Sequence, residues 1–252
     1  MTDLHVHTTF SDGKSTPEEV VRSAIEKGIA LLGFSDHSYT AFDERYCIPK
    51  DQLSAYRAAI SGLKAQYEGQ IRILCGIEQD FWSDEPPEGY DYVIGSVHYI
   101  KIRGHYLPVD ESREALLDAV SRHFGGDIYA LIDAYYRTVA QVVEKTGCQI
   151  IGHFDLISKF NEGGDLFDDT HPRYIAAWQS AADRLLETGV PFEINTGAIS
   201  RGYRTAPYPA APIREYLHSR GAKFLLSSDS HHADTLCFEF DRWSCQISDS
   251  VV

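Results

Sequence analysis

Short apolar runs alternate with longer stretches of helical periodicity along the whole chain. Seven of the runs have the length and composition of β-strands, and helical segments or loops separate them. This alternation is typical of a parallel α/β sheet or barrel. The predicted strands are Asp3–Val6, Ala30–Phe34, Ile71–Ile77, Tyr92–Val97, Gln149–Gly152, Val190–Ile194 and Lys223–Leu226.

The helical segments carry recognisable start and stop signals. Thr16 suits an N-cap, and Glu19 suits the reciprocal position of a capping box. Pro17 fits the first helical position, and Gly28 ends the segment. Two further helices are predicted from apolar stripes, which we interpret as core contacts. The stripes are Leu53, Tyr56, Ile60, Leu63 and Tyr67, before Gly69, and Leu131, Tyr135, Val139, Val142 and Val143, before Gly147.

The chain is predicted to form one domain, residues 1–252. It shows no internal repeat, no low-complexity tract and no linker rich in proline, glycine and serine. Gly125 and Gly126 mark a turn between two helices. The segment Ile199–Pro212, rich in proline and glycine, is predicted to be a long loop, and long loops at the mouth of a barrel often carry function.

Charge and length restrict the classes of partner. The 252 residues suffice for a substantial core, and the formal net charge is -14. This charge opposes binding to nucleic acid or to an anionic membrane, but it permits a small phosphorylated substrate if divalent cations reverse the field in one cleft. No apolar run approaches the roughly 20 residues of a membrane span, and no signal sequence is evident, so a cytoplasmic location is expected.

The cysteines indicate neither a disulfide framework nor a structural zinc site. They are odd in number and show no C-x-x-C pair. We interpret them as ordinary thiols in a reducing compartment. They are Cys47, Cys75, Cys148, Cys237 and Cys245.

Histidines and carboxylates gather at the C-terminal ends of six predicted strands. In a parallel barrel these ends converge on one face, so residues far apart in sequence would meet in one site. A single strand-end histidine would more often be structural, and a single aspartate would more often cap a helix, but the whole set favours a site. The set comprises His5, His7, Asp36, His37, Glu78, His98, His153, Asp229 and His231. The other histidines, interpreted as surface or packing residues in loops or helices, are His105, His123, His171, His218 and His232.

Imidazole and carboxylate together are typical ligands of zinc, manganese or iron. His5 and His7 project to the same side of a strand because the side-chain period is two. The set, with Asp12 added, exceeds what one ion needs, so two or three ions are predicted, with Glu78 able to bridge them. Clustered divalent ions generate hydroxide near neutral pH and neutralise a phosphoryl group. The sequence therefore predicts hydrolysis of a phosphate ester.

Seven segments resemble the PHP (polymerase and histidinol phosphatase) family. They are D-L-H-V-H-T-T-F-S-D-G, G-F-S-D-H, G-I-E-Q-D-F, G-S-V-H-Y, G-H-F-D-L-I-S-K-F, E-I-N-T-G and S-S-D-S-H, which together span about residues 3–231. The likeness is greatest to the monofunctional histidinol-phosphatases. It implies a distorted (β/α)7 TIM-like barrel and hydrolysis of L-histidinol phosphate to L-histidinol and phosphate, in histidine biosynthesis, by a metal-bridging hydroxide.

The resemblance also implies a trinuclear centre and its ligands. The first ion would take His5, His7, Glu78 and Asp229, the second Glu78, His98 and His153, and the third Asp12, His37 and His231. Arg201 is similar to a family arginine that approaches the substrate phosphate, and His37 is expected near the same group. Asp36 is expected either to protonate the leaving group or to orient His37. Ser158 stands where many relatives carry arginine, although Lys159 is adjacent, and the C-terminal tail lacks a clear closing helix.

Other functions remain open at this stage. The chain could be a PHP enzyme for another small phosphate or a nucleotide, or a metal-binding accessory protein without turnover. A 3′ to 5′ exonuclease is disfavoured by the net charge. Phe42, Tyr46 and Tyr203 could stack on a substrate ring but are interpreted as packing residues. The native metal and the oligomeric state are not determined by the sequence.

Overall fold

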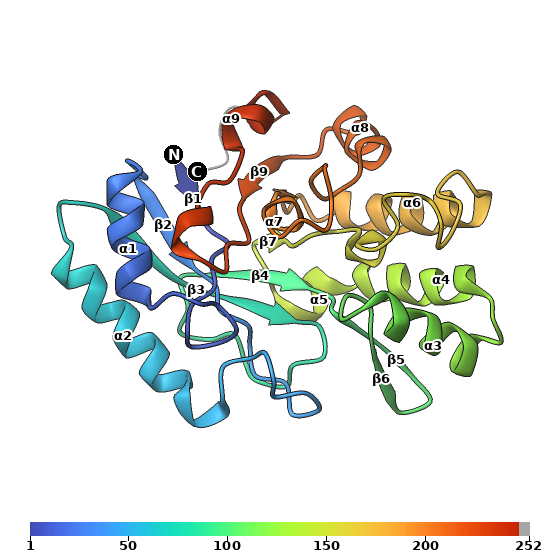
Figure 1. The fold of residues 1–252 in the computed structure, drawn as a ribbon, viewed down its shortest axis with the longest axis horizontal. Helices are drawn as coiled ribbons and strands as arrows, with labels where there is room; N and C mark the ends of the chain where they lie inside the picture. The colour runs from blue at the N-terminus through green and yellow to red at the C-terminus, as the bar shows by residue number, and fades with distance from the viewer. Residues whose placement is uncertain (247–252) are drawn as a thin grey trace.

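The computed structural model describes residues 1–246 and shows a nearly closed barrel of parallel strands surrounded by helices (Figure 1). The strand order is β1-β2-β3-β4-β7-β8-β9, and each neighbouring pair is parallel. Val6 and Ser230 form a parallel bridge beyond β1 and β9, which draws the two ends of the sheet together. The barrel strands are β1 Thr2–Asp3, β2 Leu31–Phe34, β3 Arg72–Asp80, β4 Tyr92–Ser96, β7 Ile150–Ile151, β8 Phe192–Asn195 and β9 Phe224–Ser227.

An antiparallel hairpin and a set of helices connect the barrel strands. The hairpin consists of β5 Tyr99–Ile102 and β6 His105–Pro108. The α-helices are α1 Pro17–Glu26, α2 Leu53–Gln66, α3 Arg113–Phe124, α4 Ile128–Val139, α5 Val142–Thr146, α6 Pro172–Leu186, α7 Gly197–Ser200, α8 Ala211–Ser219 and α9 Phe240–Trp243. Short 3₁₀ turns occur at Lys50–Gln52, Leu156–Ser158, Ala233–Thr235 and Ser244–Gln246.

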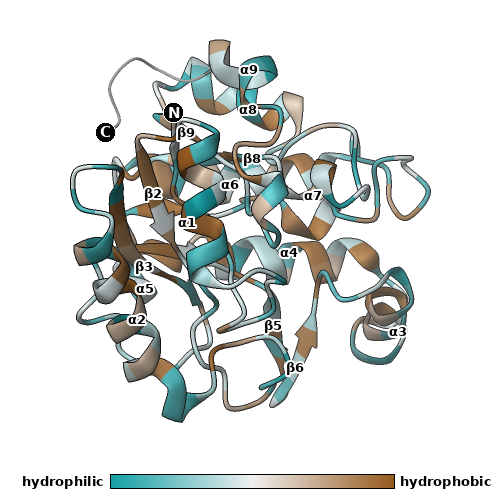
Figure 2. Cartoon of the chain, turned by 60° about the vertical axis from the view of Figure 1, so that its left-hand side comes forward, coloured by the Kyte–Doolittle hydropathy of each residue, from teal (hydrophilic) through white to brown (hydrophobic). Residues whose placement is uncertain are grey.

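Helices cover the outside of the barrel on opposite sides of the molecule. In Figure 1, α1 and α2 lie beside β2 and β3, whereas α3, α4 and α6 lie on the other side of the molecule. Figure 2 shows apolar residues concentrated on β2 and β3, while α1 is polar on its outer surface. The predicted capping box starts α1: Glu19 N donates to Thr16 Oγ1 at 3.3 Å, and Thr16 N donates to Glu19 Oε2 at 2.7 Å.

A layer of apolar side chains contributed by the strands forms a compact cluster, which comprises Leu4, Leu31, Tyr92, Ile94, Ile150 and Leu225. Tyr92 donates its hydroxyl to Leu4 O at 2.5 Å and lies 3.0 Å from Phe34 O. Its ring occupies the space that side chains at Gly33 and Gly76 would need. Apolar packing therefore fills this level of the barrel, and the polar residues collect at the carboxyl ends of the strands.

The structure confirms the (β/α)7 barrel and all seven predicted strands, with small differences in length. The hairpin β5–β6 was not predicted, and His105 therefore lies in a strand. The helix predicted through Val143 is broken between α4 and α5. Thr138 Oγ1 donates to Ala134 O at 2.9 Å just before the break, a bond that often bends helices.

One prediction near the C-terminus needs correction, and the expectation for the tail agrees with the structure. The loop predicted at Ile199–Pro212 is shorter, because Ile199 belongs to α7 and Pro212 to α8. The tail forms the short α9 and a 3₁₀ turn, and residues 247–252 lie outside the described part. Among the residues that the structure describes, no helix has the length and apolar character of a membrane span.

We predict that Gly76→Ala lowers the free energy of unfolding by roughly 1–3 kcal/mol, because overpacking forces its neighbours apart. A Cβ at this position would lie 2.3 Å from Tyr92 Cζ. Urea denaturation monitored by circular dichroism measures the change. Gly62→Ala is the control, since Gly62 lies in α2 and a Cβ added there would have nothing within 4 Å, so alanine should stabilise the protein by about 0.5–1 kcal/mol. Equal effects of the two substitutions would contradict this account of the barrel interior.

Candidate metal centre

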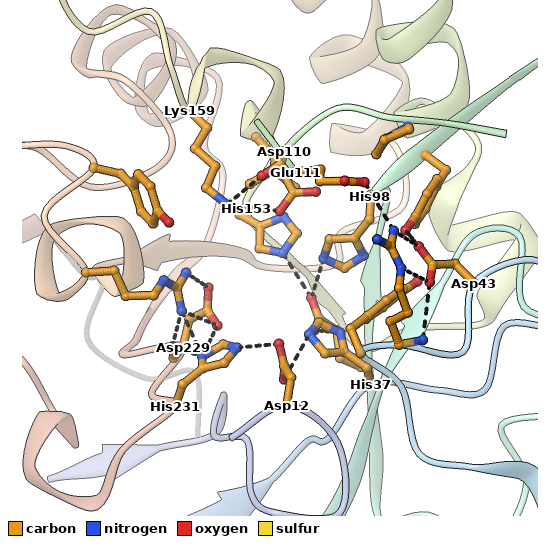
Figure 3. A pocket seen from close by; sticks show the side chains of 18 residues that line it. Asp12, His37, Asp43, His98, Asp110, Glu111, His153, Lys159, Asp229 and His231 are labelled. Carbon is orange, nitrogen blue, oxygen red and sulfur yellow. Dashed lines mark hydrogen bonds and ion pairs between the residues drawn. The ribbon is translucent and has the colours of Figure 1, made fainter. Parts of the chain in front are cut away.

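A cavity of about 350 Å³ opens at the carboxyl ends of the barrel strands (Figure 3). The side chains of most residues predicted for the site line it. His5 and His7 lie below them, with 0% exposure. The predicted residues on the cavity wall are Asp12, His37, Glu78, His98, His153, Arg201, Asp229 and His231.

Glu78, in β3, is surrounded by five imidazoles. Its Oε1 lies 2.9 Å from His153 Nε2 and 3.5 Å from His98 Nε2. Its Oε2 lies 2.7 Å from His37 Nδ1, 3.4 Å from His5 Nε2 and 3.6 Å from His7 Nε2. The carboxylate thus touches side chains from both halves of the barrel, as a bridging ligand would.

Carboxylates that the sequence analysis missed orient two of these imidazoles. His5 Nδ1 donates to Glu193 Oε1 at 2.6 Å, and His98 Nδ1 lies 3.2 Å from Asp80 Oδ2. In each case the Nε2 atom is the one directed at Glu78. A carboxylate behind a histidine in this way fixes the ring and raises its basicity as a ligand. Glu193 was detectable in the E-I-N-T-G segment, where it alternates with Asn195 on one face of β8.

Asp229 and Arg201 form an ion pair on the cavity wall. Arg201 Nη2 donates to Asp229 Oδ2 at 3.0 Å, and Arg201 Nη1 donates to Asp229 O at 2.9 Å and lies 2.8 Å from His231 Nδ1. Asp229 has a φ of 47° and packs so closely on Gly197 that a Cβ there would lie 2.7 Å from Asp229 Cβ. The backbone conformation and Gly197 together place this carboxylate, whose Oδ1 lies 3.3 Å from His7 Nε2.

Asp12, His37 and His231 form the outer part of the cluster. Asp12 Oδ2 lies 3.3 Å from His231 Nε2, and Asp12 Oδ1 lies 3.6 Å from His37 Nε2. His7 stacks on His231 with a centroid separation of 4.2 Å. Possible ligand atoms fall within 4.8 Å of one another in three groups, which differ from the implied sets because His7 and His37 each belong to two of them. The groups are His7, Asp12, His37 and His231; His5, His7 and Asp229; and His37, Glu78 and His98.

Asp36 does not line this cavity. Its fully buried carboxylate accepts hydrogen bonds from Thr8 N at 2.8 Å, Ser11 N at 3.2 Å and Ser11 Oγ at 2.6 Å. These bonds hold the loop that leads to Asp12. The geometry disfavours the expectation that Asp36 is the acid for the leaving group, and it shows no hydrogen bond to His37.

Several buried atoms of the cluster have no hydrogen-bond partner within residues 1–246. They are His5 Nε2, His7 Nδ1, His7 Nε2, Glu78 Oε2 and His153 Nδ1. Leaving a buried polar atom unpaired costs about 1–3 kcal/mol, so a native structure keeps such atoms where an ion satisfies them. The nitrogen and oxygen donors suit zinc, manganese or iron, and the described ligand candidates include no thiolate. The residues therefore fit two or three divalent ions.

The electrostatics of the cluster keep Glu78 and Asp229 ionised and His7 neutral. Burial opposes ionisation of Glu78, but His37 and His5 outweigh it and hold its pKa well below the usual range. Burial likewise opposes ionisation of Asp229, and Arg201 reverses the effect on its pKa. Burial, aided by the neighbouring imidazole of His231, lowers the pKa of His7 to about 3, so His7 is neutral near pH 7. Ionised carboxylates and neutral imidazoles are the forms that coordinate metals. Burial opposes protonation of His5, His37 and His98, but neighbouring carboxylates, Glu78 among them, outweigh it and raise their pKa, so these three rings must release a proton to bind a cation.

The outer wall of the cavity includes residues that carried no strand-end signal. They are Asp43, Arg45, Tyr46, Tyr99, Pro108, Asp110, Glu111, Leu156, Lys159 and Tyr203. Tyr203 lies edge-on to Phe160 at 6.0 Å but is 49% exposed, whereas Phe42 stacks on Tyr106 at 3.8 Å. Lys159 reaches the cavity, while Ser158 accepts a hydrogen bond from Arg204 at 2.6 Å. Loop residues of this kind follow no periodic pattern, so only the folded chain reveals them.

The five histidines excluded from the site lie away from the cavity lining. His171 and His232 accept hydrogen bonds at helix starts, from Arg173 N at 3.1 Å and Asp234 N at 3.2 Å. His105 and His123 face each other at a ring separation of 5.1 Å, and His218 lies on the exposed face of α8. Their interpretation as surface or packing residues agrees with these positions.

Comparisons with known proteins relate this geometry to a family. The PHP domain family model matches residues 3–197. The chain is 30% identical to a Deinococcus radiodurans protein named "Probable histidinol-phosphatase", across 94% of this chain and 89% of that one. It is 25% identical to the histidinol-phosphatase of Bacillus subtilis, across 95% of this chain and 96% of that one.

Solved structures share the fold. A Listeria monocytogenes protein superposes with a TM-score of 0.80 at 18% identity, covering 96% of this chain and 100% of the other. A histidinol phosphate phosphatase from Lactococcus lactis, solved with zinc, L-histidinol and phosphate, superposes with a TM-score of 0.67 at 20% identity, covering 98% of this chain and 92% of that one. Because the family model spans most of the chain and the barrel is the same, this chain belongs to the PHP domain family.

Proposed function

We propose that this chain is a metal-dependent phosphatase that hydrolyses L-histidinol phosphate to L-histidinol and phosphate. The observation that carries the proposal is the buried Glu78 carboxylate, whose oxygens lie within 3.6 Å of nitrogens from five imidazoles. The two relatives named as histidinol-phosphatases align over nearly the full length of both chains, which supports the choice of substrate. We further propose that residues 1–252 act as one unit, and a cytoplasmic location stays a prediction.

The proposed metal ligands are the residues that converge on the cavity. They are His5, His7, Asp12, His37, Glu78, His98, His153, Asp229 and His231. Divalent ions bound there would lower the pKa of a water molecule and neutralise charge on the phosphoryl group. Glu193 and Asp80 hold the rings of His5 and His98 with Nε2 toward the centre, so these ligands need little rearrangement to bind.

Arg201 is proposed to bind the substrate phosphate. Its side chain is 29% exposed on the cavity wall, and its planar guanidinium can donate two hydrogen bonds to phosphate oxygens. His37, which lies between Glu78 and Asp12, is proposed to contact the same group. Asp36 is proposed to act indirectly, because its hydrogen bonds to Thr8 and Ser11 position the loop that carries Asp12.

Two alternative functions have less support. A polynucleotide substrate would have to approach a protein of net charge -14, which repels a phosphate backbone. A metal-binding accessory protein without turnover would need the ligands but no substrate cavity, yet a cavity of about 350 Å³, with Arg201 on its wall, opens beside the cluster. Another small phosphate monoester remains the nearest alternative, because the ligands select the phosphate more than the rest of the substrate.

Metal removal is expected to lower both stability and activity. Ions bound at about 100 times their dissociation constant contribute roughly 2.7 kcal/mol each, which corresponds to a change in Tm of several degrees for a chain of this size. We predict that a chelator that removes all the ions lowers Tm by roughly 10–30 °C and abolishes phosphate release, and that added zinc, manganese or iron restores both. Elemental analysis should find two or three ions per chain. Glu78→Gln should prevent full loading, whereas the exposed His218→Gln should not, and equal metal content in these two variants would contradict the bridging role.

Substrate preference tests the proposed activity directly. We predict that metal-loaded protein hydrolyses L-histidinol phosphate with a kcat/KM at least roughly 100-fold above those for sugar phosphates and nucleotides, since a site that pairs polar groups rejects substrates lacking them. Phosphate release is measured over the panel, with a DNA oligonucleotide included. Equal or faster turnover of another compound would replace the proposed substrate and leave the hydrolase assignment intact.

Arg201→Ala is predicted to reduce kcat/KM roughly 100-fold, the usual effect of removing one donor to a phosphoryl-type transition state. Arg201→Lys should recover part of the loss, because lysine keeps the charge but not the paired donors. Arg220→Ala is the control, since Arg220 lies on the protein surface and pairs with Asp183. A loss of bound metal in Arg201→Ala equal to its loss of activity would instead assign Arg201 to holding Asp229.

A further inference from the structure

Three carboxylates line the cavity outside the proposed metal ligands: Asp43, Asp110 and Glu111. Asp43 is fully engaged, because its two oxygens accept hydrogen bonds from Arg45 at 2.8 and 2.6 Å and from Tyr99 at 2.7 Å. Glu111 pairs with Arg45 at 3.2 Å and has a side chain that is 46% exposed. Neither residue offers a fixed and unoccupied oxygen to a ligand inside the cavity.

Asp110 differs from both. Lys159 Nζ donates to its backbone oxygen at 2.8 Å and to its Oδ2 at 3.2 Å. No residue among 1–246 donates a hydrogen bond to Oδ1, and the side chain is 25% exposed. Lys159 therefore holds Asp110 by its backbone oxygen and by one carboxylate oxygen, and the second carboxylate oxygen remains available to a ligand.

The position of Asp110 relates it to the reacting phosphate. Val109 N donates to His98 O at 2.9 Å. The residue before Asp110 is therefore hydrogen-bonded to the backbone of a proposed metal ligand. In Figure 3, Asp110 and Lys159 lie beside His153, on the side of the cavity opposite Asp12. A cation recognised by Asp110 would therefore lie in the same cavity as a phosphate held by the metal centre, on the side of His153.

We propose that Asp110 binds the primary ammonium group of the substrate, and that it selects phosphate monoesters whose ammonium sits on the carbon next to the ester-bearing carbon. This inference rests on the proposed function, since L-histidinol phosphate has that arrangement. The short connection between ammonium and ester requires a carboxylate close to the metal ligands, and Asp110 meets this condition. A carboxylate and an ammonium form a short charge-assisted hydrogen bond, which neutral hydroxyl-bearing phosphates cannot reproduce.

The experiment compares L-histidinol phosphate with its deamino counterpart, 3-(imidazol-4-yl)propyl phosphate, in metal-loaded wild-type protein and Asp110→Asn. Wild-type protein is expected to prefer the amine by roughly 10- to 100-fold in kcat/KM, the range for one hydrogen bond between charged groups. Asp110→Asn should bring this ratio close to one by slowing only the amine substrate. Glu111→Gln is the matched control and should leave the ratio unchanged, because its carboxylate already pairs with Arg45.

Turnover of the deamino substrate also reports on folding and metal loading of each variant. If Asp110→Asn leaves the ratio of the two kcat/KM values unchanged, whether or not both fall, the ammonium site is overturned and the phosphatase assignment stays in place. Calorimetric binding of L-histidinol and of 3-(imidazol-4-yl)propanol, with phosphate present, supplies a readout that needs no turnover. A preference for L-histidinol that Asp110→Asn removes, in a protein that hydrolyses neither ester, would support the ammonium site and refute the proposed activity.

Discussion

The buried carboxylate of Glu78 imposes the main physical constraint on this structure. It lies at the centre of five imidazoles at a depth where an unpaired charge would cost far more than the fold can supply, so it requires cations. Where no ion is bound, His5, His37 and His98 supply positive charge, because neighbouring carboxylates outweigh their burial and raise their pKa, whereas burial and neighbouring imidazoles hold His7 neutral. Divalent ions would neutralise the carboxylates and would also bind the buried nitrogens that lack hydrogen-bond partners in the described chain. Stability and catalysis are therefore coupled at this one position.

The barrel satisfies this constraint by separating its interior into two levels. The apolar layer around Tyr92 closes one level, which leaves the carboxyl ends of the strands to carry the polar cluster. Residues that do not enter the cavity then determine its geometry: Glu193 fixes His5, Asp36 fixes the loop before Asp12, and Gly197 allows Asp229 to approach. This arrangement explains why substitutions of the residues that surround a metal site can impair it as much as substitutions of the ligands themselves.

The wall of the cavity has a different origin from its floor. Its residues come from connections between strands, including the segment after the β5–β6 hairpin and the loop between α7 and α8. Ion pairs tie these connections together: Arg45 joins Asp43 to Glu111, and Lys159 joins the segment of Asp110 to the loop after β7. Such pairs are weak where they are exposed, but around a cavity they fix which charged groups remain available to a substrate. In the proposed function, the metal centre would provide the chemistry, and these connections would select the substrate.

The sequence by itself determined the seven strands, the barrel class through the resemblance to a family, and most of the polar residues that meet at the cavity. Strands and helices are recognisable from the period of their apolar residues. Because a parallel barrel brings all the C-terminal strand ends to one face, the sequence was enough to predict that His5 and His231 lie in one site. Only the tertiary structure decided that Asp36 supports a loop and lies outside the cavity, that Glu193 and Asp80 orient two imidazoles, and that His7 lies within reach of two groups of ligands. It also decided that, of Asp43, Asp110 and Glu111, Asp110 is the carboxylate that is held in place inside the cavity with one oxygen free. The physical reason is that local periodicity records the direction of a side chain along one element, whereas hydrogen-bond partners and charge balance arise between elements distant in the chain.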